Sequence, residues 1–171
     1  MDVLARAGAR ATFFVVGEQV ERRPALVANI VAGGHVVALH GYRHRFQPRL
    51  RSSEVSEDVR RGRAVVEDAL GRSVDWHRPP YGVYSPAGLR AVRAQGMRSL
   101  LWRRWGKDWR RFTTPQRIAR RAASDVRPGD VILLHDADFY SAKDSHRRTV
   151  EALGLILTEL RTRQIGTVLP V

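Results

Sequence analysis

The sequence predicts an α/β fold built on a parallel sheet, and three observations support this. Short runs of apolar and β-branched residues alternate with helix-like segments along all 171 residues. Several of these runs are continuously apolar, as in strands that are buried on both faces. No linker or internal repeat interrupts the alternation. We therefore expect a single domain whose sheet is either open or closed into a barrel.

Six runs are expected to form strands. They are ATFFVVG, HVVALH, VDWHRP, MRSLLW, DVILLH and IGTVLPV, at 11–17, 35–40, 74–79, 97–102, 130–135 and 165–171. Each contains β-branched or aromatic residues, which fit a pleated and buried surface. In parallel α/β folds the chemistry lies at the carboxyl ends of the strands, so the residues that end or follow each run are the candidates for a site.

Helices are expected between the strands, with boundaries marked by capping residues, proline and glycine. They run from Pro24 to Gly33, from Ser52 or Ser53 as a cap, from Ser85-Pro86 to Gly96, from Thr114-Pro115 towards Gly129, and from Ser145 to Arg163. Glu54, Glu57 and Asp58 are expected in the first turn of the second of these helices, where negative charge is favourable.

Composition and charge narrow the classes of function. The chain has no cysteine, which excludes disulfides and thiolate metal sites, so a metal would need His and carboxylate ligands. The net charge is +13, but all basic residues except Lys107 and Lys143 are arginines, and they are spread along the chain. We expect no nucleic-acid partner, whereas attraction to an anionic cell-wall or membrane surface is compatible with this charge.

Polar clusters follow four of the expected strands. His40 and His44 end the second strand, Arg78 ends the third, Asp108 follows the fourth, and His135 ends the fifth. Two imidazoles four residues apart can bind one metal ion, although the pair alone fits ordinary structural histidines equally well. The recurrence of such clusters at equivalent positions favours a site.

The other clusters each allow two interpretations. Arg78 precedes Pro-Pro-Tyr-Gly, which forms either a tight loop with a solvated arginine or a rigid loop beside N–H groups that can bind an oxyanion. Asp108 lies among Trp102, Trp105 and Trp109, which are either core residues or the wall of an acyl pocket or sugar platform. His135 is either a general acid or base or a cap on exposed backbone.

Five segments together resemble the polysaccharide deacetylases, the NodB-homology domain of carbohydrate esterase family four. The segments are ATFFVVGEQV, GGHVVALHGYRH, HRPPYG, WRRWGKDW and GDVILLHDAD. The second resembles the metal-binding H-(S/T)-x-x-H motif, with Gly41 in place of the hydroxyl residue, which weakens a supporting contact but not ligation. In the fourth, Trp105 stands where the family often has an Asp.

The resemblance implies a distorted (β/α) barrel of the polysaccharide deacetylase type. The family's first motif, T-F-D-D-G-P, is missing. We therefore expect residues 1–171 to form an N-terminally incomplete polysaccharide deacetylase domain. Its first strand, with the aspartates that act as general base and third metal ligand, is expected upstream of Met1.

The resemblance also implies a function, the removal of N-acetyl or O-acetyl groups from a polysaccharide such as a chitin-like glycan or peptidoglycan. A divalent metal, zinc, is expected on His40, His44 and the upstream Asp. His135 is expected to protonate the leaving amine, with Asp108 orienting it or Arg78. The expected substrate contacts are the backbone N–H of Tyr81 and an acetyl-methyl pocket that includes Leu133 and Trp109.

One alternative is a catalytically impaired remnant of the same fold that binds a glycan or a metal. The resemblance implies an extracellular or cell-envelope location, although no signal peptide begins this sequence. The sequence does not indicate an oligomeric state.

Overall fold

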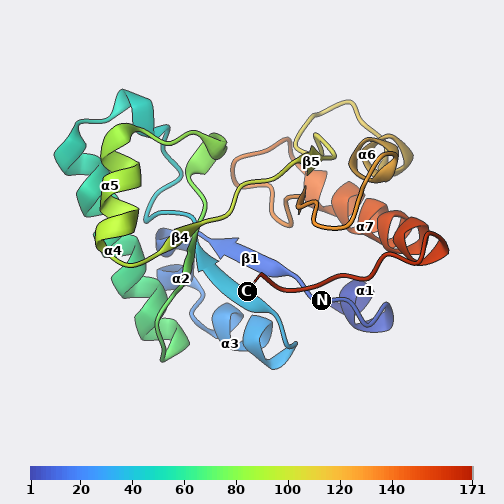
Figure 1. Ribbon diagram of the computed structural model, residues 1–171, viewed down its shortest axis with the longest axis horizontal. Helices are drawn as coiled ribbons and strands as arrows, with labels where there is room; N and C mark the ends of the chain where they lie inside the picture. The colour runs from blue at the N-terminus through green and yellow to red at the C-terminus, as the bar shows by residue number, and fades with distance from the viewer. Residues whose placement is uncertain (171) are drawn as a thin grey trace. The chain divides into compact units, whose positions relative to one another are not determined.

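The computed structural model describes residues 1–170 and consists of two compact units (Figure 1). The His40 unit comprises Arg10–Leu101 and the end of the chain from Leu169, and the His135 unit comprises Met1–Ala9 and Trp102–Val168. Each unit contains a sheet, and every strand pair within residues 1–170 is parallel. The expected α/β class with parallel strands is thereby confirmed, whereas a single domain over 1–171 stays a prediction.

The sheet of the His40 unit has four strands in the order of the chain. They are β1 (Thr12–Val15), β2 (Val36–Leu39), β3 (Trp76–His77) and β4 (Arg98–Ser99). β1 and β2 pair along their whole length, and β2 meets β3 only at its last residue, where Leu39 lies opposite His77. The carboxyl ends of β2 and β3 are therefore neighbours, which brings the residues after Leu39 close to those after His77.

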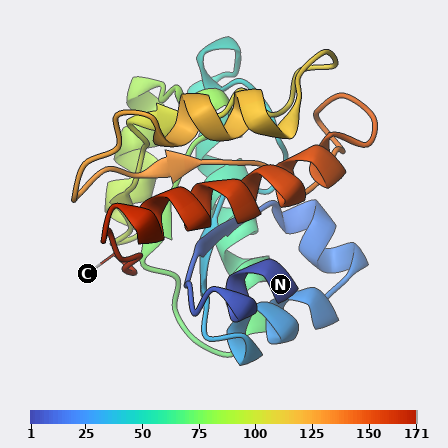
Figure 2. The same ribbon diagram turned by 90° about the vertical axis from the view of Figure 1, so that its right-hand side faces the viewer.

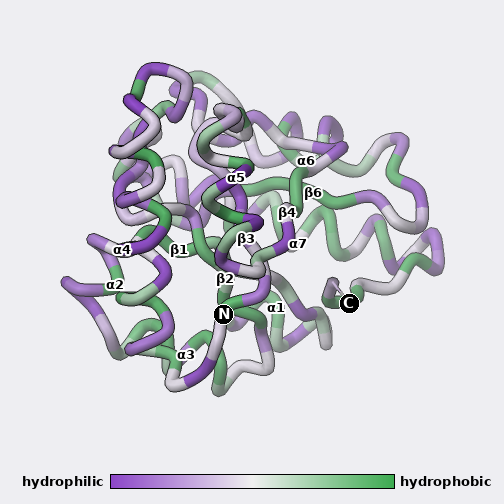
Figure 3. The backbone as a smooth tube through the Cα atoms, turned by 60° about the vertical axis from the view of Figure 1, so that its left-hand side comes forward, coloured by the Kyte–Doolittle hydropathy of each residue, from purple (hydrophilic) through white to green (hydrophobic). Residues whose placement is uncertain are grey.

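Helices surround this sheet and bury their apolar sides against it. They are α2 (Gly17–Arg22), α3 (Ala25–Ala32), α4 (Ser52–Leu70) and α5 (Pro86–Ala94), with short 3-10 turns at η1 (Gln47–Arg49) and η2 (Pro80–Gly82). Along α4 the buried positions recur every three or four residues, at Val55, Val59, Gly62 and Val66. That period places one face of α4 in the core. Hydrophobic and hydrophilic residues accordingly alternate along α4 (Figure 3).

The His135 unit has a two-stranded sheet and three helices. They are β5 (Arg104–Trp105), β6 (Ile132–Leu133), α1 (Asp2–Arg6), α6 (Pro115–Ala123) and α7 (Ser145–Thr162). Helix α6 lies alongside α7 (Figure 2), and their shared core includes Ala122, Ile156 and Leu160. Ser85 and Thr114 cap α5 and α6 as expected, since each side chain accepts a backbone N–H three residues ahead. No helix in the described part of the chain is long and apolar enough to cross a membrane.

The expected strand at 165–171 is wrong for its described part, since 165–170 forms no strand. Helix α7 ends in a turn instead, because Gln164 takes a φ of 56° and the Ile165 N–H donates to the Leu160 carbonyl. Val171 lies outside the described residues. The structure has one strand that we did not expect. It is β5, at Arg104–Trp105, which pairs with β6.

The expected start of α4 also needs correction. The helix begins at Ser52 with Arg51 as its N-cap, so neither serine caps it. Glu54 accepts the Arg51 N–H at 3.0 Å and is the acidic residue of the first turn. Asp58, one turn further along, has a different role that concerns the candidate site.

Candidate functional site

His40 and His44 lie together at the end of β2. The His40 Nδ1 is 2.6 Å from the carbonyl oxygen of Arg78, which follows β3 on the neighbouring strand. A ring N–H donated to a carbonyl fixes the tautomer and orientation of an imidazole and leaves Nε2 as the nitrogen that can bind a metal, as is usual for metal-binding histidines. The His40 and His44 ring centroids are 5.1 Å apart. The His40 ring is thus held by the Arg78 carbonyl, and the two rings are close enough to share a ligand.

The charge state of His40 suits a metal ligand. The pKa of His40 is lowered from 6.5 to about 3, chiefly by burial. The hydrogen bond to the Arg78 carbonyl raises it, and the nearby His44, His77 and Arg78 side chains lower it. His40 is therefore neutral at physiological pH, as an imidazole must be to bind a metal. No group of three or more His, Asp or Glu side chains within residues 1–170 is arranged to hold a metal ion.

Arg78 is buried and held in place. Only 6% of it is exposed, its Nε donates to the Leu100 carbonyl at 2.8 Å, and its guanidinium carbon lies 3.9 Å from the centre of the Phe14 ring. Burial lowers the pKa of Arg78 to about 10, so the side chain remains cationic at neutral pH. Of the two interpretations from sequence, the solvated arginine is wrong.

Tyr81 follows Arg78 in the turn η2 and has an unusual backbone. Its φ is 61°, in the left-handed region that non-glycine residues seldom adopt. The side chain is exposed, and its ring centroid lies 4.7 Å from that of His44. Such backbone strain often accompanies a site, where the surrounding structure maintains it.

The buried histidine beside Arg78 leads to a prediction about stability and pH. Burial lowers the pKa of His77 to about 3. Between about pH 6.5 and 3 the unfolded chain binds a proton at this position that the folded chain does not. The free energy of unfolding should therefore fall on acidification, approaching about 1.4 kcal/mol per pH unit for such a group. The low pKa of His40 acts in the same direction, whereas the raised pKa of Asp58 partly offsets it at the acidic end.

Urea unfolding of the metal-free protein at pH values from 7 to 5 measures this slope, because most carboxylates are still ionised there. His77→Asn should reduce the slope of the unfolding free energy against pH by the equivalent of about one bound proton, because Asn cannot titrate. Asn can still bond the Tyr84 hydroxyl, which lies 2.8 Å from the His77 Nδ1. A stability that does not change over this range would contradict the buried neutral state of His77.

The His135 unit contains a polar cluster of its own, a pair formed by His135 and Asp108. The His135 Nδ1 lies 3.0 Å from the Asp108 Oδ1, and the His135 backbone N–H donates to the Asp108 Oδ2 at 2.6 Å. Asp108 is fully buried, whereas 35% of the His135 side chain is exposed. A carboxylate that accepts from Nδ1 fixes the tautomer and leaves Nε2 for proton transfer. His135 therefore does more than cap a strand end.

Thr149 also bonds Asp108, and the sequence analysis did not identify it as a site residue. Its hydroxyl donates to the Asp108 Oδ2 at 2.9 Å from the buried face of α7. Its own position gave one weak signal, a polar residue on the inward side of an amphipathic helix. With three donors, Asp108 is a buried carboxylate whose hydrogen bonds are made within this unit.

Aromatic side chains adjoin His135. The Trp109 ring packs edge-on against His135 with centroids 5.4 Å apart, and Trp105 lies 5.4 Å from Trp109 and 6.0 Å from Trp102. Leu133, in β6, is paired with Trp105 in β5 and is 9% exposed. The three tryptophans thus form a series of ring contacts that ends at His135, and Leu133 lies opposite Trp105 in the sheet.

Comparison with known proteins identifies the family. The family model described as "Polysaccharide deacetylase" matches residues 1–100, more than half of the chain. The chain belongs to the polysaccharide deacetylase family. A relative named chitooligosaccharide deacetylase, from Bradyrhizobium sp. (strain ANU 289), is 32% identical over 170 residues, covering 95% of this chain and 77% of its own length.

Two further proteins are similar to the chain. A peptidoglycan-N-acetylglucosamine deacetylase of Bacillus cereus is 29% identical over 163 residues, covering 94% of this chain and 73% of its own length. A family 4 acetyl xylan esterase from Clostridium thermocellum, solved with a cobalt ion, has a TM-score of 0.86 at 26% identity, covering 98% of this chain and 78% of that one.

These findings confirm the resemblance seen in the sequence. They also confirm the fold class of the polysaccharide deacetylases. The enzyme class, a hydrolase that acts on carbon–nitrogen bonds other than peptide bonds, is confirmed by the deacetylase relatives. The roles of the individual site residues stay predictions.

Proposed function

We propose that this protein is a metal-dependent deacetylase that removes N-acetyl groups from a polysaccharide, either a chitin-like glycan or peptidoglycan. The observation that carries the proposal is the pair of adjacent imidazoles after β2, with His40 held by the Arg78 carbonyl, within a chain of the polysaccharide deacetylase family. The names of the two relatives support N-acetylated glucosamine polymers as the substrate class.

His40 and His44 are the residues proposed to hold the metal. The neutral state of His40 and its bond to the Arg78 carbonyl fit a divalent ion such as Zn²⁺, and a cobalt ion in a similar structure supports the same class. The chemistry that such an ion supplies is Lewis-acid polarisation of the acetyl carbonyl. In this proposal Arg78 keeps His40 in the orientation needed for binding.

His135 is proposed to give a proton to the leaving amine. Its Nε2 is the nitrogen left for this task, because Nδ1 is engaged by Asp108. The buried carboxylate stabilises the protonated imidazole and holds its ring in place, in the way an Asp supports the His of a catalytic triad. The oxygen of a water molecule bonds to the acetyl carbon, the water's protons pass to solvent, and the carbon–nitrogen bond breaks. The amine then leaves as a neutral group with the proton from His135, and the acetyl group leaves as acetate.

The remaining residues are proposed to bind the acetyl group. The backbone N–H of Tyr81, presented by a strained turn, donates to the oxygen that becomes negatively charged during the reaction. Trp109 and Leu133 enclose the methyl group, since both lie beside His135 or on the strand that precedes it. An apolar wall here selects acetyl over larger polar substituents.

Acetate release tests the proposal directly. The protein, supplied with Zn²⁺ or Co²⁺, should release acetate from N-acetylated chitooligosaccharides or from peptidoglycan, and a chelator should stop the release. Re-addition of the ion should restore it. A protein that binds these glycans but releases no acetate under any metal condition would instead be the catalytically impaired binding protein considered from the sequence.

A further inference from the structure

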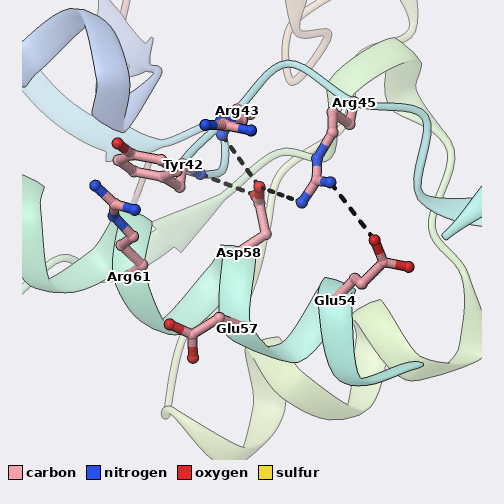
Figure 4. A pocket seen from close by; sticks show the side chains of 7 residues that line it. All are labelled: Tyr42, Arg43, Arg45, Glu54, Glu57, Asp58 and Arg61. Carbon is pink, nitrogen blue, oxygen red and sulfur yellow. Dashed lines mark hydrogen bonds and ion pairs between the residues drawn. The ribbon is translucent and has the colours of Figure 1, made fainter. Parts of the chain in front are cut away.

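The loop between the two metal-site histidines depends on a side chain from another element. This loop, Gly41–Arg43, has no regular secondary structure. Asp58, on α4, accepts the Tyr42 N–H at 2.9 Å and the Arg43 N–H at 3.2 Å through its carboxylate (Figure 4). One side chain thus bonds two successive peptide groups between His40 and His44.

The loop is also held from its other side. The N–H groups of Gly17 and Glu18, at the start of α2, donate to the Gly41 and Tyr42 carbonyls at 3.0 Å each. The carbonyls therefore face α2 and the amides face Asp58. This division leaves the loop little freedom to change the separation of the two imidazoles.

Gly41 and Asp58 are matched sterically. Gly41 has a φ of 92°, and a Cβ built on it would lie 2.8 Å from the Asp58 Oδ2. Real Cβ atoms essentially never come this close to another heavy atom, so a side chain at position 41 would have to push the carboxylate aside. The absence of a side chain at position 41 is what lets Asp58 reach the loop amides.

The surroundings of Asp58 indicate a structural support rather than a ligand site. Asp58 and its neighbours line a small hollow, yet their charges point at one another: Arg45 lies 3.3 Å from the Asp58 Oδ1 and 3.8 Å from Glu54 (Figure 4). The Asp58 side chain is only 10% exposed. Its acceptor capacity is directed to the loop and to Arg45.

We infer that Asp58 is a positioning residue for the metal site, which fixes the Gly41–Arg43 loop so that His40 and His44 are presented to one ion. The inference rests on the proposed function, because it assumes that these histidines bind a metal. Gly41 has no side chain with which to hold the loop between the histidines, and the inference gives this role to the Asp58 carboxylate on α4.

The test compares Asp58→Ala and Asp58→Asn with Glu57→Gln. Glu57 lines the same hollow on the same helix, but its hydrogen bonds go to Arg60 and not to the loop, so it is the matched control. Affinity for Co²⁺ or Zn²⁺ is measured by calorimetry. Asp58→Ala should weaken it by roughly 10- to 100-fold, the usual effect of losing a residue that supports metal ligands. Asp58→Asn should fall in between, because its amide oxygen can still accept one N–H.

A second measurement needs no metal. Hydrogen exchange of the Arg43 amide should accelerate in both Asp58 variants and stay unchanged in Glu57→Gln. The Tyr42 amide is a poorer probe, since it also lies 3.2 Å from the Asp58 backbone carbonyl. Thermal unfolding by circular dichroism identifies any variant that fails to fold.

The Gly41→Ala variant offers an independent way to displace the Asp58 carboxylate. Its effect on metal affinity should be less than additive with that of Asp58→Ala.

Two outcomes would overturn the inference. One is a folded Asp58→Ala protein that binds Co²⁺ as tightly as the wild type, and the other is an Arg43 amide that stays protected in the variant. If the wild type binds neither ion, the proposed function fails, while the exchange of Arg43 still decides whether Asp58 holds the loop.

Discussion

His135→Gln should lower kcat for acetate release by about 10²- to 10⁴-fold, the range that a positioned general acid contributes. Glutamine is similar in size and polar, but it cannot deliver a proton to the leaving amine. The backbone N–H of residue 135 should still bond Asp108, since only the side-chain bond is removed. Metal affinity should stay at the wild-type value, because the proposed ligands are His40 and His44.

Steady-state kinetics on N-acetylated chitooligosaccharides, alongside calorimetric metal titration, checks this expectation. Asp108→Asn should also reduce kcat strongly, because an amide cannot stabilise a protonated imidazole. The two variants act on one unit, so the double variant should be little worse than the more damaging single one. Thr149→Val removes only one of the three donors to Asp108 and is the milder control. Full activity in His135→Gln would remove this residue from the mechanism.

His40→Ala and His44→Ala should each abolish measurable activity through loss of the metal. Each variant removes one of two neighbouring imidazoles, so affinity should fall by more than the roughly 100-fold that loss of a supporting residue can cause. With Co²⁺ as a probe, the visible absorption of the bound ion should disappear. His135→Gln is the control that keeps both ligands and should keep the spectrum. Unchanged cobalt binding in either alanine variant would show that these histidines are not the ligands.

The strands that the sequence predicted best are those with long apolar runs of their own. The runs at 11–17 and 35–40 are long and apolar, and they form the fully paired strands β1 and β2. The run at 97–102 shrinks to Arg98–Ser99, both of which are exposed, because its pairing with β3 covers just two residues. Local propensity does not determine how far a short neighbouring strand extends.

The site residues likewise differ in whether local sequence or a tertiary contact reveals them. His40, His44, Arg78 and His135 could be chosen from the sequence because they stand where apolar runs end. Asp58 and Thr149 could not, because each acts on a residue 13 to 41 positions away through a contact that only folding creates. In the sequence Asp58 looked like an ordinary acidic residue near the start of a helix.

The way in which Asp108 is anchored has an evolutionary consequence. Two of its three hydrogen bonds, from the backbone N–H of residue 135 and from Thr149, do not involve the His135 side chain. A mutation that replaces this histidine therefore leaves the carboxylate mostly satisfied and the fold nearly intact. Under the proposed role of His135, descendants of such a chain can lose catalysis without losing their architecture. A codon change that restores histidine would place its ring beside Asp108 again.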